Sequence, residues 1–478
     1  MTGPPGAAAP GPPAAPPATG PTGRAVPPRR ALLAGAAGNF VEWYEFGVYG
    51  CFATVIADRF FTPGTAGTDP AAPLLAAYAS FAVAFFFRPA GALLFGRLAD
   101  RAGRRPALVL VIALMTLATT LIGLLPDRAT AGAAAPWLLV LLRAVQGLCA
   151  GGEFGGAVAL MTEHAPPGRR GRYGAWQSFT VALGLLAGAA AAALTASLLP
   201  PAALYGWGWR IPFLLALPLG LTALALRTTL PEPRPRTPAP EPAPAPAPAA
   251  EPVPALAPLP VPDPLPVPDP ASASDPAPAP RIGTARAVVL GVGRIMGWSA
   301  AGYTFLVVLP SYLQSTLGAS FREALIATTL ANLGFAASIL PAGRLSDRVG
   351  RRPVMLAGAL AVALCALPLL HLLRDPATAA PAKAAALLAA GATVGLLAGP
   401  GPAMLAEMFP SAVRCTGLGL AYALANAVFS GCAGLIVTAL TAATGDPDVP
   451  AYYAGGLCAL SALALAGLRG DDHRGALR

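Results

Sequence analysis

Apolar residues occupy most of the chain in long runs that recur along nearly its whole length. An apolar run of about 18 residues or more is long enough to cross a bilayer as a helix. About twelve such runs can be distinguished, and each predicts a membrane-spanning helix. They lie near residues 32–57, 71–95, 106–125, 137–161, 174–197, 209–226, 287–310, 324–342, 354–373, 385–404, 415–440 and 452–468. We therefore expect an all-α polytopic membrane protein.

Composition supports this class of protein. Only 11% of the residues are charged and 55% are hydrophobic, whereas soluble domains carry roughly 25% charged residues. The net charge of +10 could suggest a nucleic-acid partner. The positions of the basic residues decide whether this charge reflects nucleic-acid binding or the topology of a membrane protein.

The basic residues gather in alternate connections between the predicted helices. If the N-terminus lies inside, the outer connections hold little more than Arg59, Arg128, Arg322, Arg374 and Lys383. The inner ones hold Arg97, Arg101, Arg104, Arg105, Arg169, Arg170, Arg172, Arg344, Arg348, Arg351, Arg352 and Arg414. This asymmetry predicts that both termini are cytoplasmic in the cell membrane. It explains the basic excess as topology, so we expect no nucleic-acid partner.

A proline-rich segment over residues 228–286 divides the chain. It contains EPAPAPAPAA and VPDPLPVPDP, in which proline at every second position excludes helix and favours extended polyproline II. We interpret it as a cytoplasmic linker. The expected organisation is a disordered tail (1–30), a six-helix bundle (31–227), the linker, a second six-helix bundle (287–469) and a short cytoplasmic tail (470–478).

A loop motif occurs twice, once in each half. GRLADRAGRRPAL follows the second predicted helix, and GRLSDRVGRRPVM follows the eighth, which indicates parallel repeats. Its glycines permit a tight turn, its aspartate can accept hydrogen bonds at a helix N-terminus or pair with an arginine, and its arginines hold the loop at the cytoplasmic face. The motif residues are Gly96, Asp100, Arg101, Gly103, Arg104, Arg105, Gly343, Asp347, Arg348, Gly350, Arg351 and Arg352, and we expect them to take part in gating.

The paired loop motif, the twelve helices and the long central segment resemble the major facilitator superfamily. Four stretches resemble its metabolite:proton symporter family more specifically: GNFVEWYEFGVYG, FFFRPAGALLFGRLADRAGRRP, RAVQGLCAGGEFGGAVALMTEHAPPGRRG and EMFPSAVRCTGLGLAY. The resemblance implies proton-coupled uptake of a small metabolite such as α-ketoglutarate, citrate, shikimate, proline or betaine. It also implies that Arg143, in RAVQG, is linked to proton transfer, and that Glu45 stands where the family usually has aspartate.

Ionisable residues inside the predicted helices are the main candidates for function. Each costs at least about 2.5–3.5 kcal/mol on insertion, so its presence needs a reason. Gly38, Glu42, Glu45 and Tyr49 are spaced four, three and four apart, so they share one arc of the first helix. Desolvation favours the neutral form of such a carboxylate and a nearby cation favours the charged form, so it can exchange a proton. The alternative for each glutamate is a structural ion pair.

These considerations give two sets of candidate residues. The proton-coupling set is Glu45, Glu42, Glu153 and Arg143. The substrate-binding set is Arg88, Tyr49, Gln146, Arg294, Trp298, Tyr303 and Asn332. Arg88 can pair with a glutamate of the first or fourth helix, or it can hold a substrate carboxylate. Anchoring at the membrane interface explains Arg294 almost as well as substrate binding.

We expect a secondary transporter that imports a small organic acid or a zwitterion together with protons. The alternative is a proton-coupled exporter on the same fold. Such exporters usually carry Gly-Pro in the fifth helix, whereas here Gly-Pro occurs in the tenth, within residues 399–402. A membrane sensor with the linker as a docking site would leave the buried charges unexplained.

We expect neither an enzyme nor a cofactor or metal site, because no nucleophile–base pair, phosphate loop or metal-ligand spacing is visible. The expected partners are the substrate, protons and the lipid bilayer. We expect the monomer to be the functional unit.

Overall fold

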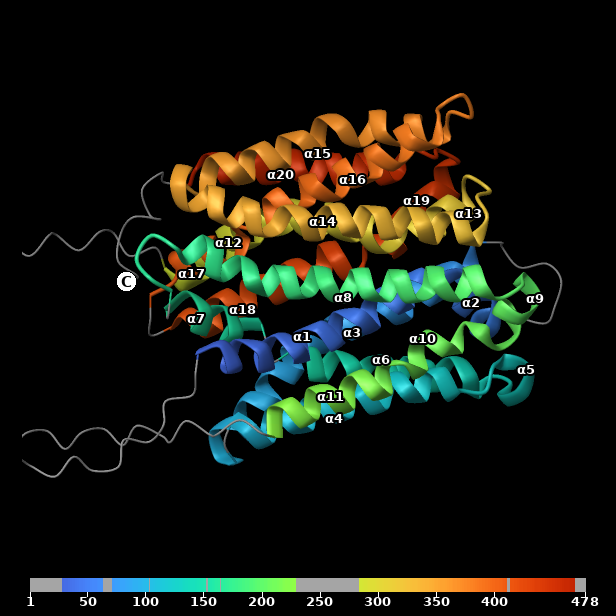
Figure 1. Cartoon of the computed structure of the whole chain (residues 1–478), viewed down its shortest axis with the longest axis horizontal. Coiled ribbons are helices and arrows are strands. Elements are labelled where there is room, and N and C mark those ends of the chain that lie inside the picture. Colours follow the sequence, from blue (N-terminus) through green and yellow to red (C-terminus); the bar gives the residue numbers. More distant parts are fainter. Residues whose placement is uncertain are drawn as a thin grey trace, which may run out of the picture.

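The computed structural model describes residues 28–62, 71–102, 104–151, 154–163, 165–228, 283–410 and 413–468. Within these ranges the chain is all-helical and forms twelve rods, several of them composed of consecutive helical pieces (Figure 1). The expected fold class is therefore confirmed. The N-terminal tail, the proline-rich residues 229–282 and the C-terminal residues 469–478 lie outside the described residues.

The first six rods form the N-half. They are α1–α2–η1 (Pro28–Cys51, Ala53–Ile56, Ala57–Phe61), α3 (Ala72–Ala102), α4 (Arg104–Leu124), α6–α7 (Ala134–Ala150, Phe154–Glu163), α8 (Arg170–Leu198) and α9–η2–α10–α11 (Pro201–Ala203, Leu204–Gly208, Arg210–Leu214, Ala216–Thr228). The short α5 (Arg128–Ala131) lies in the connection before α6.

The other six rods form the C-half. They are α12–η4–α13 (Thr284–Tyr303, Thr304–Val308, Leu309–Ser315), α14 (Phe321–Val349), α15 (Arg351–Arg374), α16–α17 (Ala380–Ala398, Gly401–Met408), α18–η6–α19 (Arg414–Ala425, Asn426–Gly431, Ala433–Thr444) and α20 (Val449–Ala466). The η segments are π-helical turns: η1 ends the first rod of the N-half, and η4 interrupts the first rod of the C-half.

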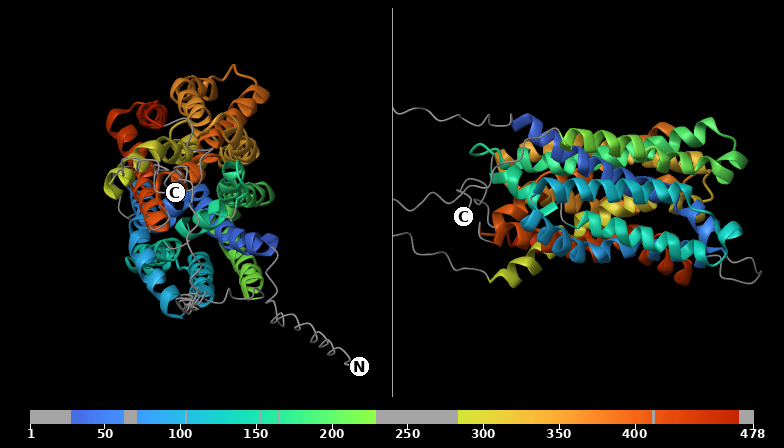
Figure 2. Two further views of the ribbon diagram at one scale, coloured as in Figure 1. Left: turned by 90° about the vertical axis from the view of Figure 1, so that its left-hand side faces the viewer. Right: turned by 90° about the horizontal axis from the view of Figure 1, so that it is seen from below.

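Most of the rods are long and apolar enough to cross a membrane. Among the described residues, ten helical spans meet this criterion, and Ala134–Ala150 is a shorter apolar helix. Their axes run roughly parallel (Figure 1), and the end-on view shows the N-half and the C-half largely on opposite sides of the bundle (Figure 2). We call the end that carries α7 and α17 the inner end and the end that carries α9 and α13 the outer end.

The two halves contact each other through equivalent rods. The fifth rod of the N-half, α8, packs along the second rod of the C-half, α14, and α3 packs in turn against η6 and α19. The first rods also meet, because α1 contacts η4 and α13. In both cases the second rod of one half packs against the fifth rod of the other half. This symmetry agrees with the internal repeat of the sequence.

Small residues bring α6 close to α3. A side chain at Gly147 would overlap the backbone carbonyl of Ala84, and one at Gly151 would overlap that of Arg88. Helices approach closely in membranes where such small residues face the neighbouring backbone. The contact places the polar residues of α6 beside Arg88 of α3 and beside α1.

Two helix starts differ from expectation. Helix α1 begins at Pro28, inside the expected tail, because proline is tolerated in the first turn of a helix. Helix α12 begins at Thr284, inside the expected linker, since residues 284–286 contain no proline and Gly283 is its N-cap. The fourth predicted helix contains α6 and α7, and residues 152–153 between them lie outside the described residues.

Candidate transport site

The two glutamates of α1 are both buried but have different partners. Glu42 forms an ion pair with Arg88 of α3, with Oε1 and Nη2 3.1 Å apart. The Arg88 guanidinium also lies over three rings, 4.4 Å from the centroid of Phe85, 5.0 Å from that of Phe46 and 5.6 Å from that of Trp43. A cation over the face of an aromatic ring is attracted by the ring quadrupole, so these rings stabilise the charge of Arg88.

The C-half completes this group with Tyr303, the last residue of α12. Its ring packs edge-on against Phe85 at 5.5 Å and against Trp43 at 6.2 Å. Its buried hydroxyl makes no hydrogen bond within the described part of the chain. We call Glu42, Trp43, Phe46, Phe85, Arg88 and Tyr303 the interface cluster, because both halves contribute to it.

Glu45 belongs to a second group inside the N-half. Its Oε2 accepts a hydrogen bond from Gln146 Nε2 at 3.3 Å, and the same nitrogen lies 2.6 Å from Thr119 Oγ1. Its Oε1 makes no hydrogen bond to the described residues, although the side chain is only 1% exposed. A buried carboxylate oxygen without a partner is costly when charged.

Arg143 of α6 lies in the same region. Its guanidinium stacks 3.5 Å from the ring centroid of Tyr49, and the Tyr49 hydroxyl in turn bonds Ser80 Oγ at 2.6 Å. None of its three nitrogens makes a hydrogen bond to the described residues, and the side chain is 0% exposed. Glu45 and Arg143 attract each other electrostatically without a direct bond. We call Glu45, Tyr49, Thr119, Arg143 and Gln146 the coupling cluster.

Four predicted site residues, Trp298, Arg294, Glu153 and Asn332, belong to neither cluster. Trp298 reaches the interface through Tyr422, whose ring lies 5.9 Å from it and stacks 3.4 Å from Phe154 of the N-half. Arg294 instead donates to the carbonyl of Ala464 at 3.4 Å, within the C-half. Glu153 lies outside the described residues.

Asn332 has a local partner in the C-half. Its amide donates to the carbonyl of Leu306, inside the π-helical turn η4, at 3.2 Å, and to that of Thr328 at 3.0 Å. The side chain thus supports the backbone of the turn that contacts α1.

The second copy of the loop motif joins the halves at the inner end. Asp347 accepts hydrogen bonds from the backbone N–H groups of Gly171 and Arg172, at 2.7 and 2.8 Å, where α8 begins. It also pairs with Arg351 at 2.7 Å. The aspartate thus makes both kinds of contact expected for this motif, because a helix N-terminus and an arginine both favour a negative charge.

The glycines and arginines of this copy also have distinct places. Gly350 has a φ of 99° at the turn, and Gly343 packs against Gly171 and Ala175 of α8. Arg351 is buried, whereas Arg348 and Arg352 are exposed. In the first copy Arg101 is exposed and Gly96 is helical, whereas the side chains of Asp100, Arg104 and Arg105, and all of Gly103, lie outside the described residues.

Two further ion pairs cross between the halves at the inner end, and the sequence did not lead us to expect them. Arg414 Nη1 lies 2.7 Å from Glu163 Oε1, and Arg170 Nη1 lies 3.4 Å from Glu407 Oε1, which also contacts Arg351 at 3.0 Å. In each half the arginine follows the glutamate by seven residues, and each pairs with its counterpart from the other half. This repeated spacing is the signal that could have identified them.

Neutral contacts join the halves at the outer end. Thr54 Oγ1 donates to Gln314 Oε1 at 3.0 Å, and the hydroxyls of Tyr78 and Ser311 lie 2.5 Å apart. The ring of Phe321 packs against Phe52 at 5.5 Å. Since the described residues join the halves at both ends, the interface cluster lies between two sets of contacts.

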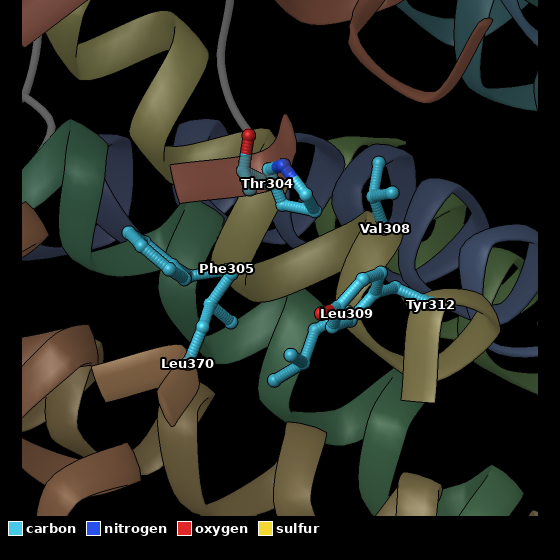
Figure 3. A pocket seen from close by; sticks show the side chains of 7 residues that line it. Thr304, Phe305, Val308, Leu309, Tyr312 and Leu370 are labelled. Atoms are coloured by element: carbon cyan, nitrogen blue, oxygen red, sulfur yellow. The ribbon is translucent and has the colours of Figure 1, made fainter. Parts of the chain in front are cut away.

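A pocket in the C-half is not part of either cluster (Figure 3). Apolar groups of η4, α13, α15 and α20 line it, with Thr304 and Tyr312 as its polar residues. The Tyr312 hydroxyl donates to the carbonyl of Pro447. The pocket therefore offers no charged group for a metabolite.

Two repeated six-rod halves, with buried charges between contacts at both ends, define a secondary transporter. Comparisons with known proteins agree. Residues 31–234 match the family model for "Sugar (and other) transporter", and residues 289–477 match that for the "Major Facilitator Superfamily".

Curated relatives cover most of the chain. The ectoine/proline transporter ProP of Corynebacterium glutamicum is 34% identical over 92% of this chain and 84% of its own length. The proline/betaine transporter of Escherichia coli is 32% identical over 89% and 80%, and the citrate-proton symporter of Klebsiella pneumoniae is 31% identical over 88% of each. The chain belongs to the major facilitator superfamily and, within it, to the metabolite:proton symporter family.

Solved structures show the same fold. A D-xylose-proton symporter superposes with a TM-score of 0.69 at 20% identity, covering 93% of this chain and 98% of its own. The partially occluded inward-open form of the xylose transporter XylE from E. coli superposes with a TM-score of 0.67 at 17% identity, covering 91% and 96%.

Proposed function

We propose that this protein is a proton-coupled symporter that takes up a small organic acid or zwitterion by alternating access. The observation that carries the proposal is the coupling cluster. Within the described part of the chain, one oxygen of the buried carboxylate of Glu45 has no partner, and the nearby buried guanidinium of Arg143 makes no hydrogen bond. The names of the relatives, which include a citrate-proton symporter, support the same function.

Glu45 is the proposed proton site. When charged, it compensates the buried charge of Arg143; when protonated, it remains in the hydrogen-bond network of Gln146 and Thr119 as a neutral group. Protonation therefore leaves Arg143 without a negative neighbour in this cluster. The uncompensated cation then favours a negative charge nearby, so a substrate carboxylate binds more tightly when Glu45 is protonated. This electrostatic effect links proton binding to substrate binding.

We infer that the inner end faces the cytoplasm. The arginine-rich connections lie at this end, in agreement with the positive-inside rule. Alternating access then requires that the ion pairs of the inner end and the neutral contacts of the outer end open in turn. The interface cluster lies between them, where opening of either end would expose it.

The first test is Glu45→Gln in proteoliposomes with an inward proton gradient. Labelled α-ketoglutarate, shikimate, citrate and betaine are the test substrates. We expect wild-type protein to accumulate at least one of them against its gradient, and Glu45→Gln to lose this accumulation because glutamine cannot exchange a proton. Exchange of labelled for unlabelled substrate without a gradient should persist in the variant.

Glu323→Gln is the matched control, because Glu323 is exposed at the start of α14 and glutamine can keep its capping contact with Ser320. It should accumulate substrate like the wild type. Uphill uptake that persists unchanged in Glu45→Gln would remove Glu45 as the proton site. If the wild-type protein showed only proton-driven efflux, the proposed uptake would be wrong and the protein would be an exporter.

A further inference from the structure

The interface cluster holds a cation among aromatic rings. Trp43, Phe46 and Phe85 each lie within 5.6 Å of the Arg88 guanidinium. Tyr303 adds a fourth ring from the other half of the protein, in contact with Trp43 and Phe85. Rings in this arrangement recognise organic cations, and above all quaternary ammonium groups, in the same way as a guanidinium.

The charges of the cluster cancel. Its described residues hold one carboxylate, Glu42, and one guanidinium, Arg88, and both are at least 95% buried. A zwitterion could exchange partners with this pair and leave the net charge at zero. A dicarboxylate would instead add two negative charges opposite a single cation, and burying uncompensated charge is strongly unfavourable.

Two buried polar atoms of the cluster have hydrogen-bonding capacity left. The Tyr303 hydroxyl and the Nε of Arg88 make no hydrogen bond to the described residues. Both can donate to a carboxylate oxygen, and Tyr303 is 95% buried. A hydrogen-bond acceptor among the rings would therefore satisfy two groups that have no partner among the described residues.

We propose that the interface cluster selects a zwitterion that carries an ammonium group close to a carboxylate. This inference rests on the proposed transport function and names its substrate class. The substrate carboxylate would bind Arg88 and the Tyr303 hydroxyl. Its ammonium group would bind Glu42 and the rings of Trp43, Phe46 and Phe85.

The exchange of ion-pair partners between the substrate and the Glu42–Arg88 pair also couples recognition to the contact between the halves. Glu42 and Arg88 belong to the N-half and Tyr303 to the C-half, so a substrate bound to all three bridges the two halves. Tyr303 directly precedes η4, the π-helical turn that contacts α1. Binding at the cluster therefore acts where the first rods of the two halves meet.

The test measures binding without a gradient. Purified full-length protein in lipid nanodiscs is titrated with labelled glycine betaine, and two competitors are compared. The first is 3,3-dimethylbutanoate, which has carbon in place of the quaternary nitrogen and keeps the carboxylate. The second is the dicarboxylate α-ketoglutarate. We expect glycine betaine to bind and both competitors to bind at least about tenfold more weakly.

Ring variants identify the residues responsible. Trp43→Leu should weaken binding of glycine betaine at least about tenfold and leave binding of 3,3-dimethylbutanoate nearly unchanged. Trp43→Phe keeps an aromatic face and should weaken binding of glycine betaine less than Trp43→Leu does. Trp137→Leu is the matched control, because Trp137 is 75% exposed at the start of α6. Tyr303→Leu serves as a second variant if Trp43→Leu does not fold.

Three results would overturn the inference: no binding of glycine betaine, equal competition by 3,3-dimethylbutanoate, or tighter binding of α-ketoglutarate. Because the assay needs no proton gradient, it is separate from the test of symport. Selective binding of glycine betaine without uphill uptake would contradict the proposed function alone. Uphill uptake of a dicarboxylate with no binding of glycine betaine would contradict the inference alone.

Discussion

Arg88 and Arg143 are two buried arginines with opposite degrees of pairing. Arg88 has Glu42 at 3.1 Å and three rings around it, whereas Arg143 has the face of Tyr49 and no hydrogen bond to the described residues. Removing one partner of a buried ion pair leaves the other charge uncompensated, whereas replacing an unpaired charge by an apolar side chain removes a desolvation cost. The two arginines should therefore differ in what they contribute to stability.

We expect Arg88→Met to lower the free energy of unfolding by about 3–5 kcal/mol, because it leaves Glu42 buried without its cation. Arg143→Met should lower the free energy of unfolding less, because Glu45 has no direct bond to Arg143 and can take up a proton, but it should abolish uptake. Thermal unfolding in detergent and uptake into proteoliposomes measure the two effects. The double variant Arg88→Met/Glu42→Leu should recover most of the stability. An equal loss of stability in both single arginine variants would contradict the distinction.

At the scale of elements, the approach of α6 to α3 determines where the two clusters lie. Gly147 and Gly151 of α6 face the carbonyls of Ala84 and Arg88 with no room for a side chain. Gln146, next to Gly147, thereby reaches Glu45 of α1. A small change in helix spacing would separate these partners.

Gly147→Ala is accordingly expected to destabilise the protein by about 1–3 kcal/mol, since the added methyl group overpacks a tight helix contact. It should also reduce uptake, because α6 carries both Arg143 and Gln146. Gly206→Ala is the control, as a side chain there meets nothing within 4 Å. The melting temperatures of the two variants decide the prediction. It fails if Gly147→Ala melts at the wild-type temperature.

At the scale of the whole molecule, the two ends are joined by different chemistry. At the inner end the halves are joined by the ion pairs of Glu163 and Glu407 and by hydrogen bonds from backbone N–H groups to Asp347. At the outer end they are joined by hydroxyl and amide groups and by aromatic rings. The balance between these two sets of contacts determines which end opens more readily.

Glu407→Gln removes the negative charge that holds Arg170 and Arg351 at the inner end. We expect it to shift the population toward the inward-open form. Spin labels at Arg101 and Arg352, exposed inner-end positions of the two halves, should show a longer distance in this variant by pulsed electron paramagnetic resonance. Gln314→Leu, which removes the outer contact with Thr54, should not lengthen it. An unchanged distance in Glu407→Gln would refute the proposed lock.

Much of the candidate site could be predicted because it depends on local pattern. The spacing of Glu42 and Glu45 placed both on one buried arc of α1. The loop motif left two partners open for its aspartate, a helix start or an arginine, and Asp347 contacts both. The sequence could not predict that Glu42 and Glu45 belong to different clusters, since this depends on which neighbouring helix lies beside each glutamate. The local partners of Arg294 and Asn332 depend on packing within the C-half for the same reason.

The sequence by itself determined the membrane class, the repeat and the family, because long apolar runs and short motifs are properties of contiguous residues. Only the tertiary structure decided that Glu42 neutralises Arg88, that Glu45 leaves Arg143 without a direct bond, and that Glu163 and Glu407 each pair with an arginine of the other half. These contacts join residues far apart in the chain. Their energies depend on distances of a few ångströms between helices, which no local pattern specifies.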